Sequence, residues 1–444
     1  MKCTQNADGH WPQNMWLNGS TYWRGIQMDG TSFVILLADL LRRTGELSEL
    51  MPWPSVRAAA EFLVKNGPES DQDRWEENPG YSTYTMAVEI AALLAAADFA
   101  DDAKEDKLAD YLRQTADTWN SNIDQWTYAS GTELARKVDV DGYYVRIAPP
   151  EVLETGSVLN VAVKIKNQPA DKGTLPASAV VSPDALGLVR YGLRAADDPR
   201  IVNTVKVIDA TLRSVVSTGP LWHRYTMDGY GETSDGGPFR NAGIGRGWPL
   251  LGGERAHYEL ARGNRVEARR LLSVMAKQTS AGALIPEQVW DAADIPEREL
   301  FNGHPSKSGM PLVWAHAEYV KLVRSLRDER VFDTPPQTVQ RYQVQKTGAS
   351  FSAWRFNHMA RHLLQGTNLR VELLAPALVH WSADNWKTIA DITTADSGLG
   401  LHYADLPTNK LLAGGKVIFT FFWRDACKWE GANWEVVAVP KNSL

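Results

Sequence analysis

Cysteine is nearly absent from this sequence of 444 residues, which has only Cys3 and Cys427, one near each end. Two cysteines can build neither a disulfide framework nor a cysteine-rich zinc site, and they leave the redox compartment undecided. No apolar run approaches the roughly 18 residues of a membrane-spanning helix, so we expect no such helix. The opening residues MKCTQNADGHW lack the apolar stretch of a signal peptide, so they leave the location of the protein unknown.

A basic excess is absent as well. The chain has 47 Lys and Arg against 53 Asp and Glu, a formal net charge of −6, whereas a nucleic-acid partner calls for a basic face. Hydrophobic residues make up 44% and charged residues 23%, which is ordinary for a soluble globular protein. We therefore expect neither nucleic acid nor a membrane as a partner.

Several common catalytic signatures are missing. There is no P-loop, no HExxH and no GxSxG, and the glycines of GIGRGW (243–248) have the wrong spacing for a dinucleotide-binding loop. The segment VDVDGYY (138–144) begins like a calcium-binding loop but lacks the later ligands. We expect no metal or organic cofactor, with a structural calcium ion as the open alternative.

Tryptophan, by contrast, is abundant, with 17 residues. Four segments concentrate Trp, Tyr, Gly and carboxylates next to expected helices: 8–30, 74–82, 221–239 and 282–291. If the helices converge, these segments converge too. Flat aromatic rings beside hydrogen-bonding groups are typical of a site that binds sugars.

Apolar residues at helical spacing predict a mainly α-helical protein. The segment 80–100 is apolar on nearly all sides, which indicates a buried helix, and 102–119 is a more polar partner. This alternation suggests helices in inner and outer pairs. The expected helices are 29–44, 54–66, 80–100, 102–119, 183–194, 198–217, 244–262, 264–279 and 309–328.

Strand-type patterns interrupt the helices in two places. Residues 120–182 read as a partly β insertion within a helical domain 1–330. After a predicted linker at 331–344, residues 345–444 read as a β-sandwich-like domain. The long polar loops 218–243 and 280–308 favour functional roles.

Two glutamates are candidates for acid and base catalysis. Glu76 follows Trp75 next to a Pro-Gly turn, where an indole and a helix end could remove water from the carboxyl group and so favour its protonated form. Alternatively, Glu76 and Glu77 only complement the dipole of the following helix. Glu287, in PEQVWD, could activate a water molecule, or it could be a capping residue in a surface loop.

Six ordered motifs resemble the bacterial branch of the glucoamylase–glucodextranase family of glycoside hydrolases. The resemblance covers about residues 5–329 and, in the bacterial form, also 345–444. The matching strings are WPQNMWLNG with YW, G and QMDG, then RWEENPGYS, RY with DGYGE, GIGRGWPLLGGERAHYELA, IPEQVWD and GMPLVWAHAEYVKL.

The resemblance implies an (α/α)6 toroid with the active site at the mouth of its inner ring. It also implies an exo-acting, inverting α-glucosidase that releases β-glucose from the ends of α-glucans, with α-1,4 links favoured and α-1,6 activity as the alternative. Secretion or a periplasmic location is the corresponding expectation. By resemblance Glu76 is the general acid and Glu287 the general base, and the glucose sites are lined by Trp23, Asp29, Trp75, Glu77, Tyr81, Arg224, Trp290 and Trp314.

Inversion requires the two carboxyl groups to stand roughly 6.5–9.5 Å apart, which leaves room for a water molecule. Residues as distant in sequence as Glu76 and Glu287 cannot share one helix face, but two loops on one rim of a ring can oppose them. Uronic-acid lyases can also be helical toroids, yet their sites call for basic residues and the matched loops here are acidic.

The resemblance fails at the front of the chain. Members of the family carry a β-domain and the first ring helices before the QNxW motif, whereas this sequence starts just before QNMW. We therefore expect a toroid that is incomplete at its N-terminal side. Its exposed apolar helices could be covered by association of copies. A glucan-binding fragment with impaired catalysis is a further alternative.

Overall fold

Helix α3 forms the centre of the helical part of the computed structural model, which describes residues 4–23, 25–47, 53–169, 171 and 173–440. Alanine and leucine on all its sides let α3 pack against α1, α2, α4 and α7 at once. By length and composition alone α3 could cross a membrane, although the sequence analysis found no apolar run of that length. In the structure, however, 94% of its apolar window is buried. The bounds are α1 (Met28–Arg43), α2 (Trp53–Asn66), α3 (Thr83–Asp102), α4 (Asp106–Thr127) and α7 (Leu186–Arg190).

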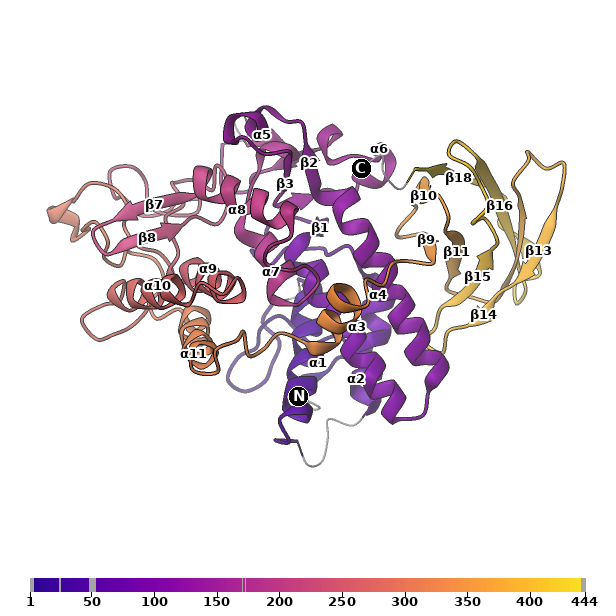
Figure 1. Ribbon diagram of the computed structural model, residues 1–444, viewed down its shortest axis with the longest axis horizontal. Helices are drawn as coiled ribbons and strands as arrows, with labels where there is room; N and C mark the ends of the chain where they lie inside the picture. Colours follow the sequence, from indigo (N-terminus) through magenta and orange to yellow (C-terminus); the bar gives the residue numbers. More distant parts are fainter. Residues whose placement is uncertain (1–3, 24, 48–52, 170, 172, 441–444) are drawn as a thin grey trace.

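Further helices continue the paired arrangement on the other side of the domain (Figure 1). Helix α9 packs against both α10 and α11, and α7 connects this group to α3. The bounds here are α8 (Pro199–Thr211), α9 (Pro249–Ala261), α10 (Arg265–Lys277) and α11 (Val313–Arg327). Short helices lie between the long ones: α5 (Glu133–Val138), α6 (Val152–Thr155), η2 (Val158–Asn160), η3 (Ala177–Ala179), η4 (Pro183–Ala185) and η5 (Pro296–Arg298).

Two predicted helix boundaries are wrong. Helix α4 extends to Thr127 because Ile123 and Trp126 continue its buried face, so the β insertion begins at Tyr128 rather than at 120. The helix predicted for 198–217 ends at Thr211. The following residues form β7 (Arg213–Val216), since they pair antiparallel with β8 (Gly219–Trp222).

The β insertion is a series of small two-stranded ladders at the start of α3. Strand β1 (Tyr81–Ser82) directly precedes α3 and pairs with β4 (Ile147–Ala148). Strands β2 (Tyr128–Ser130) and β3 (Gly142–Tyr144) form a second ladder, and β5 (Ala162–Lys164) and β6 (Thr174–Pro176) form a third. The pairing of β1 with β4 brings this insertion to the N-terminal end of the central helix.

The C-terminal part is strand-rich and lies beside α4, on the side away from α9 and α10 (Figure 1). One sheet has the order β10-β18-β16-β12-β13, with β17 on β16, and the other has the order β14-β15-β11-β9. In β16 every second residue points inward, so that Val417, Phe419 and Phe421 join Trp354 in the core. The strands are β9 (Phe351–Trp354), β10 (His362–Leu364), β11 (Asn368–Leu373), β12 (Ala377–Ser382), β13 (Ala390–Thr393), β14 (Ala395–Asp396), β15 (His402–Leu406), β16 (Lys416–Trp423), β17 (Lys428–Trp429) and β18 (Trp434–Val439).

The segment predicted as a linker is folded rather than extended. It contains α12 (Pro336–Thr338) and the π-helical turn η6 (Val339–Val344). Tyr342 is buried, and the guanidinium of Arg341 donates two hydrogen bonds of 2.6 Å to Asp117 on α4. The two parts of the chain are therefore joined by a packed connection.

Candidate active site

Aromatic side chains from two of the four tryptophan-rich segments and from neighbouring helix ends meet in one cluster. The Trp75 ring lies 5.4 Å from the Trp248 ring and 5.6 Å from the Trp314 ring. The guanidinium of Arg224 lies 5.2 Å from the Trp75 ring and 4.8 Å from the Tyr230 ring. Of the four segments predicted to converge, 74–82 and 221–239 meet in this cluster, together with Trp314 at the start of α11.

The turn that follows Asp73 carries the first candidate glutamate. One carboxylate oxygen of Asp73 accepts from the main-chain N–H groups of Trp75 (3.2 Å) and Glu77 (3.0 Å), and the other accepts from Arg146 (2.6 Å). Glu76 itself has a φ of 62°, an unfavourable conformation for a residue with a side chain. Strain of this kind is maintained by the surrounding contacts and is found most often at functional sites.

Glu77 is held on every side. Its carboxylate accepts hydrogen bonds from Arg146 (3.0 Å), Arg224 (3.0 Å), Asn167 (2.9 Å) and the hydroxyl of Tyr225. The side chain is only 4% exposed, so these four donors compensate a buried negative charge. The carboxylate of Glu77 is therefore fixed in place by four donors.

Glu76 has the opposite environment. Its side chain is exposed, and within the described part of the chain no hydrogen bond or ion pair involves its carboxyl group. The expectation that Trp75 removes water from this group is wrong, because Glu76 is exposed whereas Trp75 is buried. A carboxyl group that is free while its neighbour is fixed remains available to a bound molecule.

Glu287 lies in the loop between α10 and α11. Its N–H donates to the carbonyl of Gly309 (2.8 Å), and its carboxyl group is hydrogen-bonded to Tyr230. Burial raises the pKa of Glu287 above its usual range, while the nearby positive charge of Arg224 opposes the rise. Arg224 thus acts on both candidate loops, since it also binds Glu77.

Comparison with known proteins decides the family. The model of glycosyl hydrolases family 15 matches residues 7–324. The chain belongs to this family. The resemblance predicted from the motifs is confirmed.

Relatives of this family 15 chain include a glucoamylase of Clostridium sp. (strain G0005), 39% identical over 338 residues, which are 76% of this chain and 44% of the relative. A crystal structure of a bacterial glucoamylase complexed with acarbose is also 39% identical, with a TM-score of 0.67 over 77% of this chain and 46% of its own. An uncharacterized glycosyl hydrolase of Methanocaldococcus jannaschii is 33% identical over 116 residues, 25% of this chain and 19% of that protein. The likeness confirms the (α/α)6 toroid type, and the structure itself shows the strand-rich C-terminal part. The chain spans less than half the length of both glucoamylases.

Three residues predicted to line the glucose sites, Trp314, Trp23 and Asp29, differ in how much of their side chain is exposed. Trp314 is half-buried at the start of α11, in the aromatic cluster. Trp23 is 42% exposed and follows a small hairpin closed by the pairing of Met15 with Thr21, so it can stack on a ligand. Asp29 is buried in the first turn of α1, and this burial raises its pKa to about 7.

Two predictions for family 15 glucose contacts are wrong. Tyr81 and Trp290 have no exposed surface, so neither can contact a sugar directly. The hydroxyl of Tyr81 is hydrogen-bonded to His358 (3.0 Å), and the indole of Trp290 donates to the carbonyl of Ala293 (2.8 Å). Both residues support the loops that carry the site rather than the ligand.

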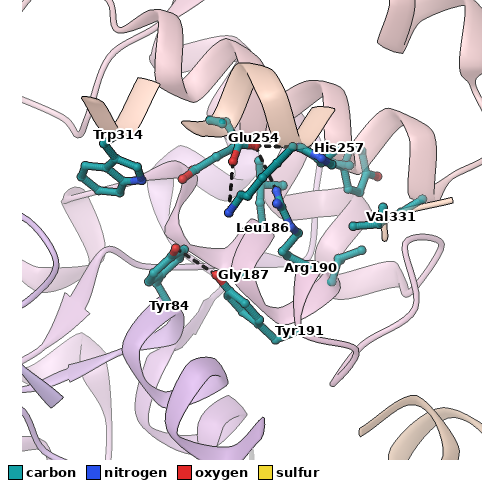
Figure 2. A pocket seen from close by; sticks show the side chains of 14 residues that line it. Tyr84, Leu186, Gly187, Arg190, Tyr191, Glu254, His257, Trp314 and Val331 are labelled. Atoms are coloured by element: carbon teal, nitrogen blue, oxygen red, sulfur yellow. Dashed lines mark hydrogen bonds and ion pairs between the residues drawn. The ribbon is translucent and has the colours of Figure 1, made fainter. Parts of the chain in front are cut away.

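The sequence did not predict the buried residues that support the site, Arg74 and its partners Glu254 and Asp184. Arg74 is buried and donates to Glu254 (2.6 and 3.1 Å) and Asp184 (2.7 Å), which ties the acidic turn to α9 and η4. Figure 2 shows Glu254 with Tyr84 and Trp314 along a neighbouring pocket between the ring helices. Arg74 was visible in the string RWEENPGYS, but its partners are 110 and 180 residues away.

Metal binding has no structural support in the described ranges. No group of three or more His, Cys, Asp or Glu side chains able to hold an ion occurs there. The segment 138–144 forms the end of α5 and the start of β3, with Asp139 in the left-handed conformation that terminates the helix. Cys3, one of the two cysteines, lies outside the described residues, and Cys427 is exposed and free.

Proposed function

We propose that this chain is an exo-acting, inverting α-glucosidase of the glucoamylase type, which releases β-glucose from the non-reducing ends of α-glucans and prefers α-1,4 links. The observation that carries the proposal is the contrast among three glutamates. The Glu77 carboxylate is fixed by four donors, whereas the carboxyl group of Glu76 beside it has no partner among the described residues. Glu287 is half-buried near Arg224, which also binds Glu77.

In the proposed reaction Glu76 donates a proton to the glycosidic oxygen as the bond to the anomeric carbon breaks. Glu287, as a carboxylate, takes a proton from a water molecule whose oxygen attacks the opposite face of that carbon. Glucose with inverted configuration and a shortened glucan leave together. Proton exchange with solvent then restores both glutamates, so no cofactor is needed.

Substrate binding follows from the fixed groups. We assign Glu77 and Arg224 to the hydroxyls of the terminal glucose, because a rigid carboxylate accepts and a guanidinium donates hydrogen bonds in defined directions. Trp314 and Trp23 offer faces on which sugar rings can stack. A relative complexed with acarbose supports an oligosaccharide ligand for this chain.

The Glu76→Gln variant tests the proposal. Amide replacement removes the transferable proton but keeps size and polarity, so glucose release from maltose should fall by about 10²–10⁴-fold while the circular dichroism spectrum is unchanged. The matched control is Glu297→Gln, an exposed glutamate in the long loop of Glu287. Unchanged turnover in Glu76→Gln would exclude the assignment.

The substrates used decide between the alternatives. Faster hydrolysis of isomaltose than of maltose would favour α-1,6 activity of the glucodextranase type. Binding of maltoheptaose without glucose release by the unmodified chain would identify a glucan-binding protein without catalysis.

A further inference from the structure

The turn that follows β5, residues 165–168, lies against the turn that carries Glu76. The ammonium of Lys166 donates to the main-chain carbonyl of Glu76 (3.0 Å), and the amide of Asn167 donates to the carboxylate of Glu77 (2.9 Å). In return, the amide of Asn78 donates to the carbonyl of Lys164 (2.9 Å). Three hydrogen bonds therefore join two segments that are about 90 residues apart in sequence.

The same turn also touches the segment that carries Arg224. The amide of Gln168 donates to the carbonyl of Met227 (2.9 Å). Gly229 approaches so closely that a Cβ atom on it would lie 1.7 Å from the carbonyl oxygen of Asn167. The turn 165–168 thus contacts both the loop that carries Glu77 and the loop that carries Arg224, which supply the fixed groups of the proposed site.

Alternation along β5 explains why the turn can hold a position. Val163 and Ile165 are buried, whereas Lys164 and Lys166 point outward. The buried pair anchors the strand in the core, and the N–H of Ile165 donates to the carbonyl of Gly173 across the hairpin (2.6 Å). An anchored strand can orient its outward side chains better than a free loop can.

We propose that Lys166 and Asn167 are positioning residues of the proposed glucosidase, and that Lys166 also contributes to linkage preference. The inference rests on the proposed function. Asn167 fixes the direction of the Glu77 carboxylate that binds the terminal glucose. Lys166 holds the main chain of Glu76 in its left-handed turn and places a positive charge beside the leaving sugar, because the general acid faces the leaving-group oxygen.

The chain provides a matched control for Lys166. Lys164 is an exposed lysine two positions earlier on the same outward face, and its ammonium makes no hydrogen bond or ion pair with any residue described in the structure. Lys164→Met and Lys166→Met therefore remove the same charge from the same hairpin. Only Lys166→Met removes the contact with the Glu76 turn.

Kinetics on maltose and isomaltose form the first arm of the test. A small displacement of a catalytic group lowers the reaction rate strongly, so Lys166→Met should lower kcat about tenfold with KM nearly unchanged. Lys166→Arg should restore most of the lost kcat. Asn167→Ala should raise KM about tenfold, because Glu77 loses one of its orienting donors. Lys166→Met should also change the maltose-to-isomaltose ratio of kcat/KM, whereas Lys164→Met should not. Equal behaviour of the two lysine variants would overturn the inference.

Hydrogen exchange without substrate forms the second arm. Peptides that cover residues 73–80 should exchange faster in Lys166→Met and Asn167→Ala than in the unmodified protein and in Lys164→Met. Unchanged exchange in both variants would refute positioning by this turn. If the unmodified protein releases no glucose, the proposed function fails in the first arm, while the second arm still decides whether the turn positions Glu76 and Glu77.

Discussion

The loops that carry Glu76 and Glu287 differ in how far they expose the carboxyl groups of these two residues to solvent. The first loop leaves Glu76 in solvent on a strained turn and confines Glu77 instead. The second loop partly buries Glu287 and gives its carboxyl group two neutral partners, the main-chain N–H of Gly309 and the hydroxyl of Tyr230. Different environments let chemically identical side chains take different roles. The fixed carboxylate of Glu77 suits binding, and the carboxyl groups of Glu76 and Glu287 are the two left for the proposed proton transfers.

The largest expected effect comes from removing the base. Glu287→Gln should lower kcat for maltose by about 10²–10⁴-fold, because an amide cannot take the proton of the attacking water. Glucose release by a coupled assay measures the effect, and unfolding in urea should show the same midpoint as for the unmodified protein. Nearly full activity in this variant would show that Glu287 is not the base.

Removal of Arg146 should have the next largest effect, on stability. This guanidinium is fully buried and bonds to both Asp73 and Glu77, so Arg146→Met leaves two buried carboxylates short of a partner. We expect a loss of about 3–5 kcal/mol in the free energy of unfolding, measured in urea.

Arg265→Met is the control for Arg146, because Arg265 pairs with Glu329 on the surface. Its effect should stay within about 1 kcal/mol, since exposed ion pairs contribute little. Similar losses in both variants would contradict the idea that the Glu77 side of the loop is a confined charge cluster.

A smaller effect concerns pH. Burial raises the pKa of Glu287 and the hydrogen bond from Tyr230 lowers it, so Tyr230→Phe should raise the pKa further. Because a base works only when deprotonated, the acidic limb of kcat/KM should move to higher pH. Rates on maltose measured from pH 3 to 8 test the shift. A limb that moves to lower pH would contradict the assigned role.

The smallest effect lies outside both loops, at Asp29. Its folded pKa of about 7 is above that of an unfolded aspartate, so the folded state binds more protons between these values. Stability should therefore fall as pH rises through this window and should level off above it. Asp29→Asn should flatten that slope in urea unfolding at pH 5 and 8, with Asp106→Asn, an exposed aspartate on α4, as the control. An unchanged slope would show that Asp29 does not carry the linkage.

Periodicity and motifs predict the fold and the position of the site well where local sequence determines structure. The all-round apolar pattern of 80–100 identifies α3, and the Trp-rich segments identify the loops that meet at Trp75. A motif match, however, says nothing about burial. Tyr81 and Trp290 therefore lie in matched strings but face the interior.

The remaining parts of the site depend on contacts that are distant in sequence. Arg146 follows a short strand with nothing unusual in its composition, and its role appears only where it meets Asp73 and Glu77. Asn167 likewise reaches Glu77 across 90 positions. No local sequence pattern identifies such residues, because they meet their partners only when the β insertion packs against the start of α3.

The configuration of the glucose released from maltose is the most direct test of an acid and a base acting across one sugar. Proton NMR within the first minutes of reaction, before mutarotation, separates the two anomers. The account predicts β-glucose from the unmodified protein and no release from Glu76→Gln or Glu287→Gln. Initial formation of α-glucose would contradict it, because retention requires a covalent intermediate and a closer pair of carboxyl groups.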